Sequence, residues 1–247
     1  MKRLELLEEQ VNSILAIGAG KSSISMALWR ILPLSSGSIL IDGLDISTIG
    51  LDDLRSRLTI IPQDPVLFEG SLRSNLDPLQ EHTDERIWEA LNQTGLLQSI
   101  QTSSSESELV SQKMSLESSV QQDGRNYSQG QRQLLCLARA LLRSSKFIFL
   151  DEATASVDTA TDEKIQHTIR NFFNKGTVLT IAHRLKTVID YDRILVLQAG
   201  EVIEFDTPYN LLLEKGAFYQ MALDSGNYDE LVSITSVVGG VLMTAKK

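Results

Sequence analysis

The chain has 247 residues, 42% of them hydrophobic and 22% charged, with a formal net charge of -9. This composition is globular and the length suffices for one large core or two small ones, which excludes a disordered or fibrous protein. An acidic chain lacks the clustered lysine and arginine that a duplex-binding surface needs, so we expect no nucleic acid partner. The single cysteine, Cys136, excludes an internal disulfide, and its apolar neighbours predict a buried side chain.

Neither end of the sequence has the pattern of a membrane-spanning or export segment. The apolar run at 236–243 is far shorter than the roughly 20 residues of a membrane helix. Residues 1–10 interleave charged and apolar side chains, unlike a secretory signal. We therefore expect a cytosolic chain without a transmembrane segment.

Strand-like and helix-like segments alternate in the first third of the chain. The pattern predicts a hairpin at 39–47, one or two helical turns at 51–58, and a buried strand at 59–63. From about 76 to 142 the strand signals disappear, and helical segments flank a serine-rich connection at 102–119. This stretch is predicted to be a helical insert.

The alternation resumes after the insert. Residues 146–151 predict a buried strand, 159–173 a helix, 177–183 a strand, and 193–206 a hairpin that turns at Ala199 and Gly200. No repeat period is visible.

The order of these segments predicts an α/β chain with one parallel sheet interrupted by helices. We expect a discontinuous sheet domain over residues 11–75 and 143–226. A helical subdomain is expected over 76–142, and poorly ordered tails over 1–10 and 227–247.

The stretch "GAGKSS" has the composition of a phosphate-binding loop. Gly18 and Gly20 let the backbone turn so that N–H groups point at phosphate oxygens, and a helix start behind them adds positive potential. Lys21 would then reach the β and γ phosphates, and Ser22 would ligate Mg²⁺. The alternative is a glycine-bearing turn before a helix, because Leu15 replaces the first glycine of the pattern G-x-x-x-x-G-K-[ST].

Two acids follow the apolar run "FIFL". A buried parallel strand delivers the residues at its carboxyl end into the crevice where ligands bind. Asp151 can hold the magnesium shell there, and Glu152 can accept a proton from a water aimed at the γ phosphate. The alternative is a strand that ends in two solvated acids.

The stretch "YSQGQRQ" opens an amphipathic helix. Ser128 and Gln131 have the spacing of a capping box, which is the plainer interpretation. The alternative is a second phosphate site, made by Ser128, the amide of Gly130 and the positive end of the helix.

Together these stretches resemble the nucleotide-binding domain of ATP-binding cassette transporters, from Gly18 to about Gly226. "GAGKSS" looks like Walker A, "IIPQDPVLF" the Q-loop, "YSQGQRQ" the signature, "FLDEATASVD" Walker B with its D-loop, and "IAHRL" the H-loop. The sequence around these motifs, including "GSLRSNLDP", is most similar to the second, C-terminal nucleotide-binding domain of the multidrug-resistance-associated subfamily.

The resemblance implies a P-loop NTPase fold of the RecA-like kind, with a parallel sheet core and an inserted helical signature subdomain. It also implies a head-to-tail sandwich with a second nucleotide-binding domain, in which ATP and Mg²⁺ lie between Walker A of one domain and the signature of the other. The partners would be the transmembrane domains of an exporter of organic anions, conjugates or drugs, with this domain on the cytoplasmic face of the membrane.

The resemblance further implies a role for each matched residue. The phosphate loop would comprise Gly18, Ala19, Gly20, Lys21, Ser22 and Ser23. The metal and its water would be contacted by Ser22, Gln63 and Asp151, with Glu152 as general base and His183 against the γ phosphate. The nucleotide bound by the second domain would be contacted in trans by Ser128, Gly130 and Gln131. Residues 156–158 would line the interface between the two domains. Gln63 would also begin the segment that contacts the coupling helices of the membrane domain.

Two positions depart from the family pattern. Gln129 stands where the commonest signature has glycine, a variation compatible with this subfamily. Upstream of Gly18 the family has a longer antiparallel subdomain with an aromatic residue that stacks on adenine, whereas 17 residues stand here. We expect a truncated front that lacks most of that subdomain, with 11–14 forming the strand before the loop and with weak nucleotide affinity.

Two functions remain open at this stage. One is an ATP-hydrolysing domain of an exporter, which Glu152 and His183 favour. The other is a catalytically silent fragment or interaction module, which Leu15 and the missing aromatic residue favour. The cassette ATPases of chromosome maintenance or DNA repair would need a long coiled coil between Walker A and signature, and the roughly 100 residues found there exclude them.

Overall fold

The computed structural model describes residues 4–5, 13–18, 21–102, 114–151, 157–173, 176–181, 185 and 189–235. Within them the side chains of 4–5, 13–18, 21–22 and 101–102 are outside the description. The chain forms two compact units: the first comprises 1–58, 146–152 and 176–247, and the second 59–145 and 153–175. The second unit thus includes residues 59–75 and 153–175, which the sequence assigned to the sheet domain. The subdomain boundaries at 76 and 142 stay a prediction.

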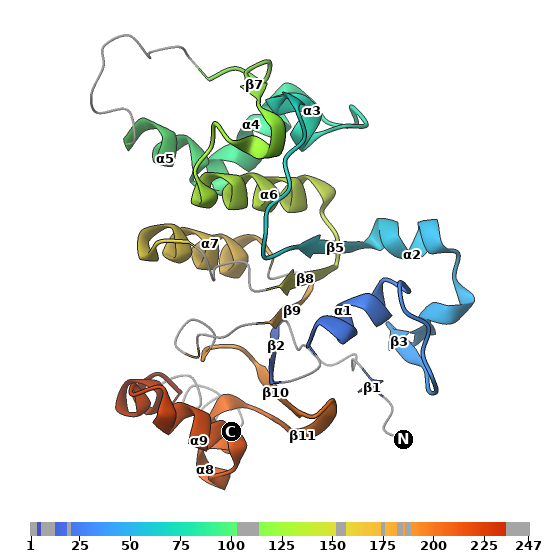
Figure 1. Ribbon diagram of the computed structural model, residues 1–247, viewed down its shortest axis with the longest axis vertical. Coiled ribbons are helices and arrows are strands. Elements are labelled where there is room, and N and C mark those ends of the chain that lie inside the picture. The colour runs from blue at the N-terminus through green and yellow to red at the C-terminus, as the bar shows by residue number, and fades with distance from the viewer. Residues whose placement is uncertain are drawn as a thin grey trace, which may run out of the picture. The chain divides into compact units, whose positions relative to one another are not determined.

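The first unit is built on a mostly parallel sheet (Figure 1). Its strands are β2 (Ser13–Gly18), β8 (Phe147–Asp151), β9 (Thr177–Ile181), β10 (Arg193–Gln198) and β11 (Glu201–Asp206). Their order is β11-β10-β2-β9-β8, and all neighbours are parallel except the hairpin β10-β11. The predicted hairpin is confirmed.

Both residues at the tip of that hairpin have positive φ. Ala199 has φ 51° and Gly200 φ 81°, the pair of left-handed conformations that a tight turn between antiparallel strands requires. Glycine adopts this conformation without cost, so the sequence located the turn correctly.

The core of the first unit lies against β8. Its residues Phe147–Leu150 are all buried, as a near-continuous apolar run in a parallel sheet predicts. Helix α1 (Lys21–Leu28) covers this face through Leu28, and Trp29 meets Phe149 edge to face with ring centroids 5.7 Å apart.

Small elements complete the amino-terminal part of the first unit. They are β1 (Leu4–Glu5), β3 (Ile39–Ile41), β4 (Leu44–Asp45), η1 (Ile46–Thr48) and α2 (Leu51–Arg57). Strands β3 and β4 form the predicted antiparallel hairpin, and β1 pairs with β3 in parallel. Residues 4–5 thus add a short edge strand to β3. The poorly ordered start expected for 1–10 stays a prediction, because the side chains of 4–5 and the remainder of 1–10 lie outside the described residues.

Helices close the carboxyl end of the first unit: α8 (Pro208–Glu214), α9 (Ala217–Asp224) and a further helix at 228–235. The prediction of a poorly ordered tail from 227 is wrong for 228–235. Leu231 is fully buried there, and Tyr228 meets Tyr219 edge to face at 5.4 Å. Residues 236–247 lie outside the described residues.

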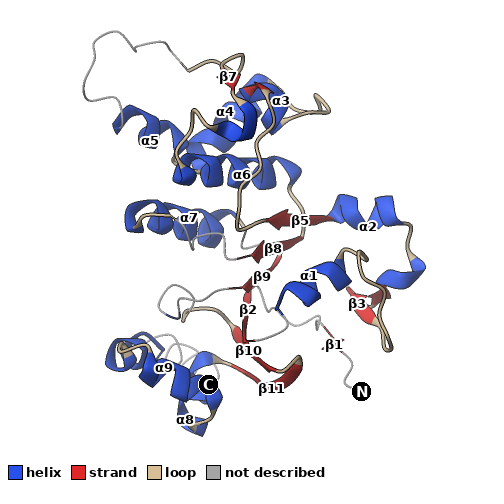
Figure 2. Cartoon of the chain, viewed as in Figure 1, coloured by secondary structure: helices blue, strands red, loops and turns tan. Residues whose placement is uncertain are grey.

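The second unit is mainly helical (Figure 2). Its helices are α3 (Leu72–Leu76), α4 (Asp84–Gln93), α5 (Leu96–Thr102), η2 (Gln122–Gly124), α6 (Gln129–Arg143) and α7 (Thr159–Phe172). The expectation that strands are absent between about 76 and 142 is wrong at β7 (Ser119–Val120), which pairs with β6 (Gly70–Ser71). Strand β5 (Leu58–Ile61) crosses from the first unit into the second.

Helix α6 is the centre of the second unit. Ten of its residues are buried, among them Cys136 as predicted, and it packs against α3, α4, α5 and α7. Burial raises the pKa of the Cys136 thiol above its usual value. None of the described helices combines the length and the apolar character needed to cross a membrane.

Candidate functional site

Three parallel strands of the first unit end at one edge of the sheet. The register places Ala16 of β2 beside Ile181 of β9, and Ile181 beside Asp151 of β8. Two strand spacings of about 4.8 Å separate β2 from β8. Gly18, the last residue of β2, therefore lies at the same edge as Asp151, where parallel sheets bind their ligands.

Helix α1 begins at this edge, three residues after Gly18. Its first turn has no acidic side chain, so the positive end of the helix is not neutralised from within. Ser23 lies in α1 with an exposed side chain. Ala19, Gly20 and the side chains of Lys21 and Ser22 lie outside the described residues.

Strand β2 is longer than the sequence predicted. We expected a strand at 11–14 and a loop from about residue 15, but the strand runs over Ser13–Gly18. Leu15 pairs with Ile194 on one side and Thr180 on the other. The apolar Leu15, Ala16 and Ile17 suit an inner strand, and as a result two residues, 19 and 20, connect the strand to α1.

The acid predicted for the metal lies at the end of β8. Asp151 is half-buried and is the last residue of the strand. Glu152 follows it directly, and His183 follows the end of β9 by two residues, but both lie outside the described residues. Among the side chains that the structure describes, no three of the types His, Cys, Asp and Glu gather in a way that could hold a metal ion.

The signature residues begin helix α6 in the second unit. Ser128 is the N-cap, and its hydroxyl accepts a hydrogen bond from the backbone N–H of Gln131 at 3.2 Å. The side-chain oxygen of Gln131 accepts in return from the N–H of Ser128 at 3.0 Å. The capping box predicted from the sequence is confirmed, and the first turn of α6 carries no acidic residue.

Gln129, which departs from the commonest signature, is held by Arg132. The guanidinium of Arg132 donates to the side-chain oxygen of Gln129 and to the backbone oxygen of Asp123, the latter at 3.1 Å. The Gln129 side chain is thus hydrogen-bonded to a residue of its own helix.

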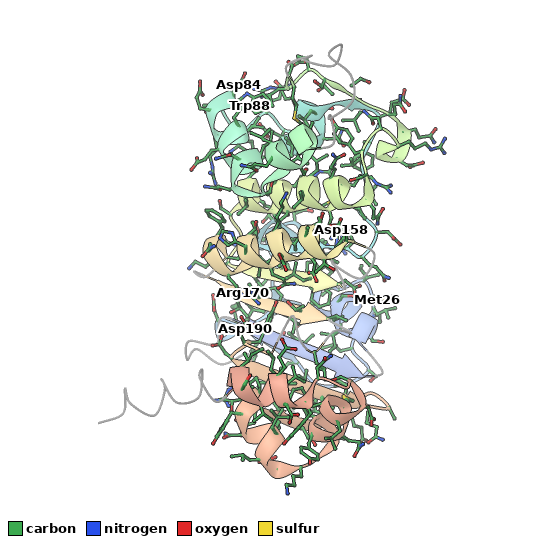
Figure 3. All side chains as sticks on the ribbon, turned by 90° about the vertical axis from the view of Figure 1, so that its left-hand side faces the viewer. Met26, Asp84, Trp88, Asp158, Arg170 and Asp190 are labelled. Atoms are coloured by element: carbon green, nitrogen blue, oxygen red, sulfur yellow. The ribbon has the colours of Figure 1, made fainter. Side chains whose placement is uncertain are left out.

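Helix α7 begins with a different cap. Asp158 accepts from the N–H of Thr161 at 3.0 Å and from its hydroxyl at 2.8 Å. These bonds, the hydroxyl first and the backbone N–H second, hold the pKa of Asp158 below its usual value. Figure 3 labels Asp158 at the start of α7. The sequence assigned 156–158 to the interface between the two domains without finding this cap; 156 lies outside the described residues.

The Q-loop residue Gln63 lies in the second unit, two residues after β5, with an exposed side chain. The backbone just before it is anchored by α6, because the side chain of Gln133 donates to the carbonyl of Pro62 at 3.1 Å. Gln133 is 1% exposed. Sequence analysis missed this contact, and its signal is a glutamine on the apolar face of an amphipathic helix.

Arg139 was also missed. Its guanidinium donates to the carbonyl of Val66 at 2.6 Å, to that of Asn75 at 2.5 Å and to the side-chain oxygen of Asn75 at 2.8 Å. Asn75 in turn bonds the backbone of Phe68 in both directions. Helix α6 therefore fixes the segment on which Val66 and Phe68 are exposed.

The geometry can be compared with known proteins. The profile described as ABC transporter matches residues 12–155. The chain belongs to the ABC transporter family. The match begins just before β2 and continues past Asp151, so it includes β2, β8 and the start of α6, while β9 follows it.

Relatives about half identical in sequence extend this result. The chain is 53% identical over 234 residues to the pleiotropic ABC efflux transporter of multiple drugs YBT1 of Candida glabrata, covering 92% of this chain and 14% of that protein. It is 50% identical over 243 residues to the ATP-dependent bile acid permease of Saccharomyces cerevisiae, with coverages of 93% and 15%. For ATP-binding cassette sub-family C member 3 of Homo sapiens the identity is 53% over 218 residues, with coverages of 88% and 14%.

The solved structure of a bacterial Atm1-family ABC exporter with ATP bound is similar in fold. The TM-score is 0.76 at 30% sequence identity, covering 87% of this chain and 37% of that one. The predicted P-loop NTPase fold is confirmed. The chain spans about one seventh of the length of the curated relatives.

Proposed function

We propose that this chain binds ATP with Mg²⁺ and hydrolyses it, as one nucleotide-binding domain of an exporter of organic anions, conjugates or drugs. The observation that carries the proposal is the edge at which β2, β9 and β8 end, with α1 starting three residues after Gly18 and Asp151 in register two strands away. An acid-free helix start suits phosphate, and a carboxylate oxygen suits Mg²⁺.

Each residue has a distinct part in this proposal. Gly18, Ala19, Gly20, Lys21, Ser22 and Ser23 hold the phosphates, while Ser22, Gln63 and Asp151 hold the metal. When bound, Mg²⁺ neutralises charge on the phosphate oxygens. Glu152 takes a proton from the water that attacks the γ phosphorus, the bond to the bridging oxygen breaks, and ADP and phosphate leave. His183 contacts the γ phosphate.

The proposed partner is a second nucleotide-binding domain. The start of α6 supports this, because Ser128, Gly130 and Gln131 begin a helix whose first turn lacks acids and can face a phosphate held by another domain. Exposed Val66 and Phe68, fixed by Arg139, support contact with the transmembrane domains near Gln63. The domain would then lie on the cytoplasmic face of a membrane.

The test of hydrolysis is Glu152→Gln, which keeps size and hydrogen bonding but removes proton acceptance. We expect turnover to fall on the order of 10²-fold or more while ATP binding survives. Lys21→Ala should weaken ATP binding itself. If the glutamine variant hydrolyses ATP at the wild-type rate, Glu152 is not the base.

A second candidate function is a domain that binds nucleotide weakly and acts as an interaction module. The length of β2 favours it, since Leu15 pairs on both sides and the N–H groups of the strand serve the sheet instead of a phosphate. Leu15→Gly distinguishes the two, because glycine weakens the strand and lets the loop form earlier. We expect the dissociation constant for ATP to fall by about tenfold; an unchanged constant would show that Leu15 does not limit binding.

A further inference from the structure

The starts of helices α6 and α7 touch at Gly130. The two helices pack against each other in the second unit, and Figures 1 and 3 both show them side by side. A Cβ atom placed on Gly130 would lie 2.8 Å from Cγ2 of Thr161, 3.1 Å from its Oγ1 and 3.3 Å from its Cβ. Real Cβ atoms essentially never come within 3.0 Å of another heavy atom, so this notch admits glycine alone while Thr161 stays in place.

Thr161 is itself held in place from its other side. Its hydroxyl and its backbone N–H both donate to Asp158, at 2.8 and 3.0 Å, so the threonine cannot swing away without breaking the cap of α7. The side chain of Thr161 therefore joins the first turn of α6 to the N-cap of α7.

We propose that Thr161 is a positioning residue that fixes the signature turn, Ser128 to Gln131, against the N-cap of α7. The inference rests on the proposed function, in which this turn faces the nucleotide of another domain. A displacement at Asp158 passes to Thr161 through two hydrogen bonds, and from Thr161 to Gly130 through direct contact. The two helix starts then move as one body.

The contact is tested by thermal unfolding of four proteins: wild type, Gly130→Ala, Thr161→Ala and the double variant. Alanine is the better helix former, so Gly130→Ala should raise the unfolding temperature by about 2–4 °C where there is room for it. With Thr161 present we expect a decrease instead. The reversal of sign between the two backgrounds is the predicted result, and an equal shift in both would overturn the contact.

The role is tested by turnover and ATP affinity measured separately. Thr161→Val keeps the shape toward Gly130 and loses the hydroxyl bond to Asp158, while Thr161→Ser keeps the hydroxyl and loses the methyl group. Both should lower turnover by about tenfold and leave the dissociation constant for ATP unchanged, because the turn acts on the other domain's nucleotide.

The matched control is Thr168→Val on the same helix. Thr168 is buried and its hydroxyl donates to the carbonyl of Lys164 at 2.8 Å, but it has no contact with Gly130 in the described structure. It should lower the unfolding temperature and leave turnover per folded molecule unchanged. Equal turnover losses in the Thr161 and Thr168 variants would overturn the positioning role.

Failure of the proposed function would look different. If the wild-type chain neither binds nor hydrolyses ATP, the positioning role of Thr161 in turnover fails with the proposed function, while the sign reversal in unfolding still reports whether the contact exists. If the wild type hydrolyses ATP and the Thr161 variants equal it, the positioning role alone is wrong.

Discussion

Two helix starts in the second unit are alike in geometry but differ in the charge of their side chains. Helix α6 begins with Ser128, an uncharged cap, and its first turn has no acid. Helix α7 begins with Asp158 and carries Asp162 in its first turn. Each helix start presents N–H groups and the equivalent of roughly half a positive charge. At α7 the acids neutralise that charge, whereas at α6 it remains available to an anion.

A capped helix start can still attract an anion when the capping side chains carry no charge. In α6 the capping box satisfies the N–H groups of Ser128 and Gln131, and the positive potential persists because neither cap is charged. The two interpretations of "YSQGQRQ", a capping box and a second phosphate site, are therefore compatible. The cap is observed, and the phosphate contact stays a proposal.

The largest expected effect comes from making α6 resemble α7. Gln131→Glu keeps the capping box, since glutamate also serves at this position, but adds a negative charge at the helix start. We expect turnover to fall by about 100-fold, comparable to the loss of one catalytic hydrogen-bond donor. The unfolding free energy should change by less than about 0.5 kcal/mol. Steady-state ATPase kinetics and urea unfolding give both values.

The matched control for that change is Ser74→Glu. Ser74 holds the same position in the capping box of α3, with Ser71 as its N-cap. It adds the same charge at a helix start that has no assigned contact with nucleotide, so turnover should be unchanged. Equal losses of turnover in the two glutamate variants would show that the added net charge, and not its place at α6, causes the effect.

Removing the caps should cost the two helices about the same stability. Ser128→Ala and Asp158→Ala each remove the side-chain acceptor of a helix start, and we expect each to lower the unfolding free energy by about 1 kcal/mol. Urea unfolding of the two variants measures this. If one variant loses nothing, its helix start is held by packing alone.

The smallest expected effect separates the caps by pH. Since its hydrogen bonds to Thr161 hold the pKa of Asp158 below that of an unfolded aspartate, about 3.9, its stabilisation is fully present above that value and is lost as pH falls through the lower folded pKa. The advantage of the wild type over Asp158→Asn should therefore shrink on acidification from pH 5. The loss of unfolding free energy in Ser128→Ala should stay the same over this pH range, because neither serine nor glutamine titrates in it. Unfolding free energies measured at several pH values check both.

Local pattern was sufficient to predict much of this chain. The hairpin tip at Ala199 and Gly200, the burial of Cys136 and the box of Ser128 with Gln131 all follow from neighbouring residues, and the structure confirms them. The strand edge was also predictable, since an apolar run before Asp151 identifies a buried strand.

What the sequence did not predict depends on partners far along the chain. Strand β2 extends through Leu15 because β9 and β10 flank it, about 165 to 180 residues later. Gln133 and Arg139 bond backbone groups of Pro62, Val66 and Asn75, which no local period reveals. The notch at Gly130 likewise appears once α7 is beside it.

Equilibrium dialysis of labelled ATP measures whether the edge at Gly18 and Asp151 binds ATP with Mg²⁺. We expect saturable binding of one nucleotide per chain in the presence of Mg²⁺, with affinity at least about tenfold lower in Lys21→Ala. Absence of saturable binding, or equal binding by wild type and Lys21→Ala, would show that this edge is not the nucleotide site.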